Sequence, residues 1–143
     1  MQMILPLSKI VKSENETIQL ATTFASILKP TDIIALTGDL GSGKTFFVKS
    51  ILKIFGIEEV TSPTFSIVNT YSSEVKINHF DFYRIKKVVE LYDIGFEEYL
   101  IDSLAITFIE WAELFEEILP SNIYRINIKY LEDSKREITI GIK

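Results

Sequence analysis

Residues 38–45, with the sequence GDLGSGKT, most constrain what this chain can fold into, because they match the P-loop pattern G-x-x-x-x-G-K-[ST] at every fixed position. Residues 33–37 before them form a short apolar run that is typical of a buried strand. Residues 46–55 after them carry apolar side chains at helical spacing, and Gly56 stands where a helix would stop. The pattern predicts a phosphate-binding loop between a strand and a helix.

The residue types in this loop suit the binding of phosphate. Glycines let the backbone curl tightly and bring its N–H groups against phosphate oxygens. The helix start adds free N–H groups and the positive end of its dipole. Lys44 is expected to reach the β- and γ-phosphates, and the Thr45 hydroxyl is expected to ligate Mg²⁺. The alternative, a glycine-rich turn that matches by chance, is disfavoured by the flanking strand and helix.

Composition limits the other possibilities. The 143 residues are 47% hydrophobic, which indicates an ordered chain, and their number predicts one domain spanning 1–143. The net charge of −5 argues against a surface that grips a polyanion, so any role on nucleic acid is expected to be indirect. With no cysteine, disulfides and thiolate metal sites are excluded. The N-terminus lacks the pattern of a signal peptide and no run is long enough to span a membrane, so we expect a cytoplasmic protein.

The order of the remaining segments predicts an α/β fold. Ser13 and Glu16 form a capping box for a helix that Pro30 closes, and residues 3–7 before it are a candidate edge strand. Further along, the patterns predict a loop at 57–63, a hairpin of strands 65–71 and 75–82, one or two short helices in 86–101 broken near Gly95, a buried strand at 104–109, a short helix through Phe115 and Ile118, and strands near 123–130 and 136–142. We therefore expect a single P-loop NTPase domain, whose mixed sheet has parallel core strands, antiparallel hairpins and helices on both faces.

Two acidic residues compete for the role of second metal ligand, which a P-loop requires. Glu110 ends the apolar run 104–109, so its carboxylate is expected at the sheet edge where ligands bind in open α/β folds. Asp81 lies in an alternating segment that puts His79, Asp81 and Tyr83 on one face. Glu110 could instead favour a helix dipole, and Asp81 could be a solvated residue or a partner of Arg84.

Three further residues have open roles. His79, the only histidine, is more often structural than catalytic in such a setting. Trp111 is expected to pack in the core rather than to stack on a base. Thr64 stands where a switch-like loop would lead into a strand, although ordinary turn chemistry explains it equally well.

Taken in order, these residues resemble the TsaE (YjeE) family of bacterial P-loop ATPases. The resemblance rests on four motifs, which are GDLGSGKT at 38–45, SPTF at 62–65, HFDFYR at 79–84 and EW at 110–111. It covers essentially the whole chain. Phe46 and Phe82 depart from the residues common in the family, at positions without a chemical role.

The resemblance implies slow, Mg²⁺-dependent ATP hydrolysis in tRNA threonylcarbamoyladenosine biosynthesis, together with TsaD and TsaB, so that tRNA is met only through the complex. When the family's motifs are carried over, the nucleotide is bound by the loop residues Gly41, Ser42, Gly43, Lys44 and Thr45 and by Phe46, which follows them. The metal is bound by Thr45 and Glu110. Asp81 supports hydrolysis, with Lys44 and Thr64 as further catalytic candidates. Glu14 matches an acidic position near the nucleotide less closely.

Two other functions remain open at this point. A small P-loop kinase shares the loop and the α/β core, but such enzymes usually need an arginine-rich lid, and Arg84, Arg125 and Arg136 are spread along the chain. A nucleotide-dependent binding module that does not hydrolyse ATP is the other alternative. ATP is favoured over GTP only by the resemblance and by the lack of a guanine-reading N-K-x-D motif.

Overall fold

Seven strands form one mixed sheet in the computed structural model, which describes residues 3–60 and 67–143. The strands lie in the order β1-β7-β6-β2-β5-β4-β3. In chain order the elements are β1 (Leu7–Val11), α1 (Glu14–Ala25), β2 (Ile33–Thr37), α2 (Lys44–Ile54), β3 (Val68–Ser72), β4 (Lys76–Asp81), α3 (Val89–Asp93), α4 (Phe96–Leu100), β5 (Ala105–Glu110), the 3₁₀ helix η1 (Ala112–Ile118), β6 (Tyr124–Tyr130) and β7 (Arg136–Ile142).

The centre of the sheet is parallel and its flanks are antiparallel. Strand β2 pairs in parallel with β5 and β6, and β4 pairs in parallel with β5. The hairpins β3–β4 and β6–β7 are antiparallel, as is the pairing of β1 with β7. This arrangement confirms the predicted mixed sheet. It also brings the carboxyl ends of β2, β4 and β5 to the same edge, where ligands bind in open α/β folds.

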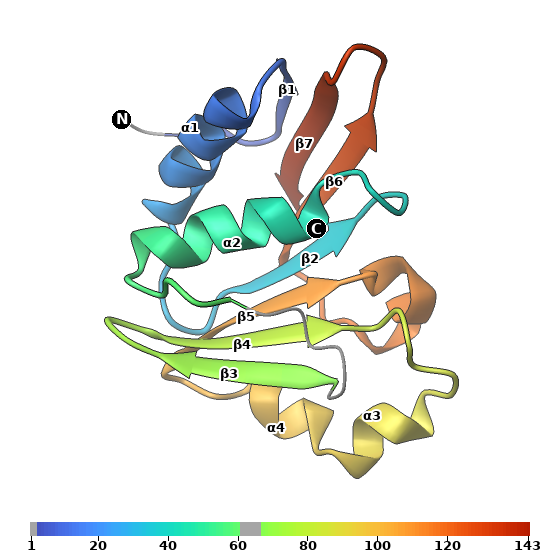
Figure 1. Ribbon diagram of the computed structural model, residues 1–143. Helices are drawn as coiled ribbons and strands as arrows, with labels where there is room; N and C mark the ends of the chain where they lie inside the picture. The colour runs from blue at the N-terminus through green and yellow to red at the C-terminus, as the bar shows by residue number, and fades with distance from the viewer. Residues whose placement is uncertain (1–2, 61–66) are drawn as a thin grey trace.

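Helices cover both faces of the sheet, as predicted (Figure 1). Helices α1 and α2 pack on one face, over a buried cluster that includes Phe24 and Phe47. The short helices α3, α4 and η1 cover the other face, where Phe80, Phe82 and Phe96 make edge-to-face ring contacts. Alternation along β4 therefore directs Phe80 away from α2 and directs His79 and Asp81 toward α2.

Helix α1 begins as the capping box predicts but ends earlier than expected. The Ser13 hydroxyl accepts a hydrogen bond from the Glu16 N–H, and the Glu16 carboxylate accepts one from the Lys12 N–H. The helix ends at Ala25 and not at Pro30, because residues 27 and 28 bond three residues back and tighten the chain into a turn.

The first strand lies later in the chain than predicted. We expected an edge strand at 3–7, whereas β1 covers Leu7–Val11 at the edge of the sheet. The physical reason is Pro6, which has no N–H to donate to a ladder, so that pairing begins only after it.

The other predicted elements agree with the structure within a few residues. Gly95, at φ 78°, separates α3 from α4. All six residues of β5 are buried, which confirms the apolar strand that ends on Glu110. The predicted strand 65–71 is confirmed over residues 68–71 as part of β3, whereas residue 67 precedes the strand and residues 65 and 66 are outside the described part. Within that part, no helix has the length and apolar character needed to cross a membrane.

Candidate functional site

The loop between β2 and α2 adopts backbone angles that only glycine tolerates well. Gly38, Gly41 and Gly43 have φ values of 143°, 80° and 112°. At Gly38 a Cβ would lie 2.4 Å from the carbonyl oxygen of Ile128 on β6, so a side chain is also excluded by space. Helix α2 begins at Lys44 with no side-chain cap, which leaves its first N–H groups directed at the loop.

Lys44 lies across the loop rather than in solvent. Its ammonium donates hydrogen bonds to the carbonyl oxygens of Gly38 and, at 3.1 Å, of Asp39. The same nitrogen lies 4.0 Å from the ring centroid of Trp111, within range of a cation–π contact. Burial lowers the pKa of Lys44, and the nearby Glu113 and Glu110 carboxylates oppose that shift. An ammonium held beside the loop is suited to neutralise a phosphate.

Asp81 and Glu110 are neighbours at the carboxyl ends of two parallel strands. Asp81 is the last residue of β4 and pairs in register with Glu110, the last residue of β5. The Asp81 carboxylate accepts a 2.9 Å hydrogen bond from the backbone N–H of Tyr83. Burial raises the pKa of Asp81, against the lowering effect of that hydrogen bond. The two acids that competed for one role in the sequence therefore lie side by side.

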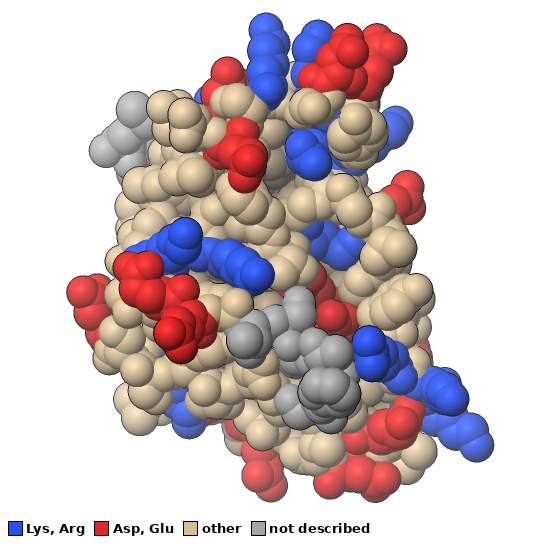
Figure 2. Space-filling model, viewed as in Figure 1, with Lys and Arg blue, Asp and Glu red and all other residues tan. Residues whose placement is uncertain are grey.

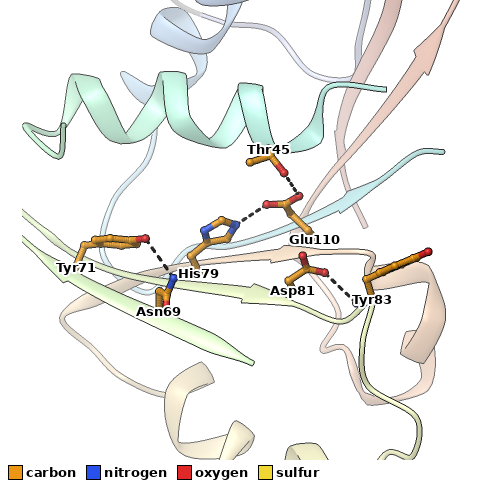
Figure 3. Close-up of polar contacts among 7 residues, drawn as sticks. All are labelled: Thr45, Asn69, Tyr71, His79, Asp81, Tyr83 and Glu110. Atoms are coloured by element: carbon orange, nitrogen blue, oxygen red, sulfur yellow. Dashed lines mark hydrogen bonds and ion pairs between the residues drawn. The ribbon is translucent and has the colours of Figure 1, made fainter. Parts of the chain in front are cut away.

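A chain of polar contacts links the loop to Glu110 and His79 (Figure 3). The Thr45 hydroxyl lies 2.7 Å from Oε1 of Glu110, and Nε2 of His79 lies 2.5 Å from Oε2. Glu110 is 2% exposed and His79 is fully buried. Both oxygens of the carboxylate are thus engaged by side chains, one from the first turn of α2 and one from β4.

Thr45, Glu110, Lys44 and Asp81 line a cavity of about 380 Å³. Its lining residues are Leu40, Gly41, Gly43, Lys44, Thr45, Phe46, Asp81, Tyr83, Arg84, Glu110 and Trp111. The loop, the metal candidates Thr45 and Glu110, and the hydrolysis candidate Asp81 thus face one space. Thr64, the remaining catalytic candidate, lies outside the described residues with the rest of its SPTF motif.

A second cavity, of about 460 Å³, adjoins the first at the loop. Gly43 and Phe46 line both cavities, and Glu14, at the start of α1, lines only the second. The nucleotide-binding candidates Glu14 and Phe46 therefore both line a cavity that reaches the loop at Gly43. Two cavities thus adjoin at the loop, one lined by Lys44 and Glu110 and the other by Glu14.

Sequence reasoning missed the part that two arginines and one tryptophan take in the site. Arg84 lines the first cavity, and Nε of Arg136 donates a 2.7 Å hydrogen bond to the carbonyl of Ser42 in the loop. Trp111 is half-buried, with its ring facing Lys44 and Tyr83, so the expected core position is only part of its role. The sequence position of Trp111, directly after Glu110, could have indicated that it belongs to the site. Nothing near Arg136 in the sequence could have indicated its contact with the loop.

The donor set fits a magnesium ion bound together with a nucleotide. Thr45 and Glu110 present a hydroxyl and a carboxylate oxygen, which are the hard ligands that Mg²⁺ prefers. Within the described residues, no three acidic or histidine side chains gather into a complete metal cage. That arrangement is typical of Mg²⁺ sites in which substrate phosphates supply the other ligands.

A central parallel sheet, a glycine loop leading into α2 and an acid on the neighbouring strand define the class of P-loop α/β domains. Comparison with known families narrows the class. Residues 11–138 match the family model described as threonylcarbamoyl adenosine biosynthesis protein TsaE. The chain belongs to the TsaE family, which confirms the resemblance found in the sequence.

Relatives and a solved structure agree with this membership. The chain is 45% identical over 130 residues to the tRNA threonylcarbamoyladenosine biosynthesis protein TsaE of Rickettsia bellii, with 89% of each chain covered. It is 41% identical over 126 residues to the protein of the same name from Bacillus subtilis, covering 87% of this chain and 78% of that one. The crystal structure of Bacillus subtilis YdiB matches with a TM-score of 0.81 at 32% identity, covering 100% of this chain and 90% of YdiB.

Proposed function

We propose that this member of the TsaE family binds and slowly hydrolyses ATP in a Mg²⁺-dependent manner, as a component of tRNA threonylcarbamoyladenosine biosynthesis. The observation that carries the proposal is the convergence of Lys44, Thr45, Asp81 and Glu110 on one cavity. The family description supplies the pathway. The side chains around the cavity support the activity.

The loop and Lys44 act on the phosphates. Backbone N–H groups of the loop and the start of α2 donate to phosphate oxygens, and the Lys44 ammonium adds a positive charge. To reach a γ-phosphate, the Lys44 amine exchanges its bonds to the Gly38 and Asp39 carbonyls for bonds to phosphate. The Trp111 ring, 4.0 Å from the Lys44 nitrogen, also lines this cavity.

The two acids have different roles, Glu110 at the metal position and Asp81 at the attacking water. Glu110 holds the Thr45 hydroxyl in place, and these two side chains would hold a Mg²⁺ ion whose positive charge would offset the negative charge of the phosphates. Asp81, fixed by the Tyr83 N–H, orients the attacking water and accepts its hydrogen bond. The water oxygen bonds to the γ-phosphorus while Asp81 takes one proton from the water, and the bond from that phosphorus to the bridging oxygen breaks. ADP and inorganic phosphate leave, and Asp81 releases its proton to solvent.

We further propose that TsaD and TsaB are the partners and that tRNA is met only through their complex. The face in Figure 2 supports indirect contact, because acidic and basic side chains are interspersed on it and no continuous basic stripe crosses it. With a net charge of −5, the chain lacks the overall charge of a polyanion binder. Hydrolysis would then reset the complex between turnovers.

The test is phosphate release from ATP, measured with the purified chain alone and after addition of TsaD and TsaB. We expect slow release alone, faster release with both partners, and near loss of release in Glu110→Gln. Glu117→Gln, on the exposed side of η1, is the matched control and should behave as wild type.

Other outcomes would favour the alternatives. Phosphate transfer only in the presence of an acceptor would indicate a kinase, and tight binding without turnover would indicate a binding module. Normal hydrolysis by Glu110→Gln would contradict the metal assignment. A pull-down with and without ATP would test the partners directly.

A further inference from the structure

His79 is a fully buried polar residue that has no role in the hydrolysis proposed above. It lies on β4 two residues before Asp81, and alternation directs it to the same face, beneath α2. Burying an imidazole away from water is unfavourable unless its nitrogens find partners. The contacts of the ring should therefore indicate what it does.

The imidazole contacts the carboxylate of Glu110 and no other described side chain by a hydrogen bond. Nε2 lies 2.5 Å from Oε2, and within the described part of the chain Nδ1 has no hydrogen-bond partner. Because an ionised carboxylate only accepts, Nε2 must carry the proton and donate it to this bond. The contact therefore specifies which nitrogen is protonated.

The other oxygen of Glu110 faces the loop. Oε1 lies 2.7 Å from the Thr45 hydroxyl, so the carboxylate is held at both ends, by β4 on one side and α2 on the other (Figure 3). A glutamate side chain has three rotatable bonds, and a single contact would leave its second oxygen free to turn. Two contacts fix the plane of the carboxylate and leave Oε1 directed at the metal position.

We propose that His79 is the positioning residue for Glu110, whose Nε2–H bond holds the carboxylate in the orientation that serves Mg²⁺. This inference rests on the proposed function, because it assigns the outer contact of the proposed metal acid. Hydrogen-bond donors behind metal-binding carboxylates commonly act this way, and their loss weakens metal affinity about 10- to 100-fold. A ring that only filled the core would not need to face a carboxylate.

The first test compares nucleotide affinity with and without magnesium. ADP and a slowly hydrolysed ATP analogue would be titrated into wild type, His79→Phe and His79→Gln, in Mg²⁺ and in EDTA. We expect His79→Phe to lose about tenfold or more of the Mg²⁺-dependent gain in affinity and to keep the affinity measured in EDTA. His79→Gln, whose amide can donate from nearly the same place, should recover most of the gain.

A matched control separates positioning from general loss of packing. Ile77→Val removes one buried methylene from the same face of β4 without touching Glu110, so it should lower the melting temperature and leave the Mg²⁺-dependent gain unchanged. If His79→Phe kept the full Mg²⁺-dependent gain in nucleotide affinity, the role of His79 would be contradicted and the proposed function would not. A wild type with no gain from Mg²⁺ would contradict the proposed metal site itself.

A second test needs no substitution at His79 and so does not depend on the folding of His79→Phe. Since the chain has one histidine, the imidazole signals in NMR spectra of tag-free protein belong to His79 without assignment. We expect a protonated Nε2 with a slowly exchanging, strongly downfield proton that moves upfield in Glu110→Gln. It should also respond to ADP with Mg²⁺ more than to ADP in EDTA. A ring protonated only at Nδ1 would overturn the inference.

Discussion

Arg136 and Ser42, which lie 94 positions apart in the chain, are joined by a 2.7 Å hydrogen bond from Nε of the arginine to the backbone carbonyl of the serine. The arginine comes from the first position of β7, and its guanidinium also faces the ring of Tyr130 at 5.3 Å. The P-loop is therefore braced from the antiparallel side of the sheet, opposite the side that supplies the acids.

Removing this brace should weaken nucleotide binding. A hydrogen bond to a charged donor contributes about 1.5–3 kcal/mol, so Arg136→Ala should lower the affinity for ADP roughly tenfold or more. Calorimetric titration would measure the change. Arg125→Ala is the control, because Arg125 pairs with Glu116 on η1 instead of the loop. Unchanged affinity in Arg136→Ala would show that the loop holds its shape without the brace.

Replacing two of the loop glycines by alanine should lower the free energy of unfolding by different amounts. Gly38 and Gly41 both have positive φ, and a side chain in the left-handed region costs roughly 1–2 kcal/mol. At Gly41 no atom lies within 4 Å of a new Cβ, whereas at Gly38 the Ile128 carbonyl lies at 2.4 Å. We expect Gly38→Ala to lower the free energy of unfolding by about 2 kcal/mol more than Gly41→Ala. Urea unfolding of both variants checks this difference, and equal values would contradict it.

Asp81→Asn should separate activity from stability. The exchange should slow phosphate release about 100-fold, since the amide cannot accept a proton from water. Burial holds the folded-state pKa of Asp81 above its ordinary 3.8, so ionisation costs stability as pH rises through that window. The neutral variant avoids this cost and should melt at an equal or higher temperature at pH 7, with a difference that shrinks below pH 4.

Asp93→Asn on the exposed side of α3 is the control for Asp81→Asn, and it should change neither quantity. A marked fall in the melting temperature of Asp81→Asn at pH 7 would mean that the carboxylate stabilises the fold instead of serving the reaction.

A pH dependence of opposite sign is expected at Asp102. Its carboxylate accepts a 2.6 Å hydrogen bond from Lys76 and another from the Leu104 N–H, and these contacts hold its pKa below the ordinary 3.8. Its contribution to stability is present above that value and is lost as pH falls through the folded-state pKa. Asp102→Asn should therefore melt slightly below wild type at pH 7, and the two curves should converge in acid. Salt should reduce the difference, because the Lys76 side chain is 40% exposed.

The fold could be predicted well from local patterns, because its elements are marked by them. The P-loop, the largely apolar β5 and the break at Gly95 each carry a signal within a few residues. Pro6 is a local signal for the later start of β1, because it has no N–H to donate to a ladder. The early end of α1 could not be predicted as easily, because it depends on turn hydrogen bonds that have no strong local signal.

The candidate site could be predicted where strand ends determine it. Glu110 and Asp81 each follow a strand pattern, so their place at the sheet edge could be expected, whereas their side-by-side register depends on how β4 and β5 pair. The contact of Arg136 with the loop and the buried contact of His79 with Glu110 depend on the tertiary structure. A single histidine in an alternating strand predicts a face of the sheet but not the partner on the next strand.

The position of β2 at the middle of the sheet has a consequence for how the molecule opens. Its loop is held by β7 through Arg136 on one flank and by β5 through Glu110 on the other. A nucleotide in the two adjoining cavities would contact the start of α1 as well as the ends of β4 and β5. We expect its binding to slow hydrogen exchange in both flanks at once, so that neither half of the sheet can open until the ligand has left.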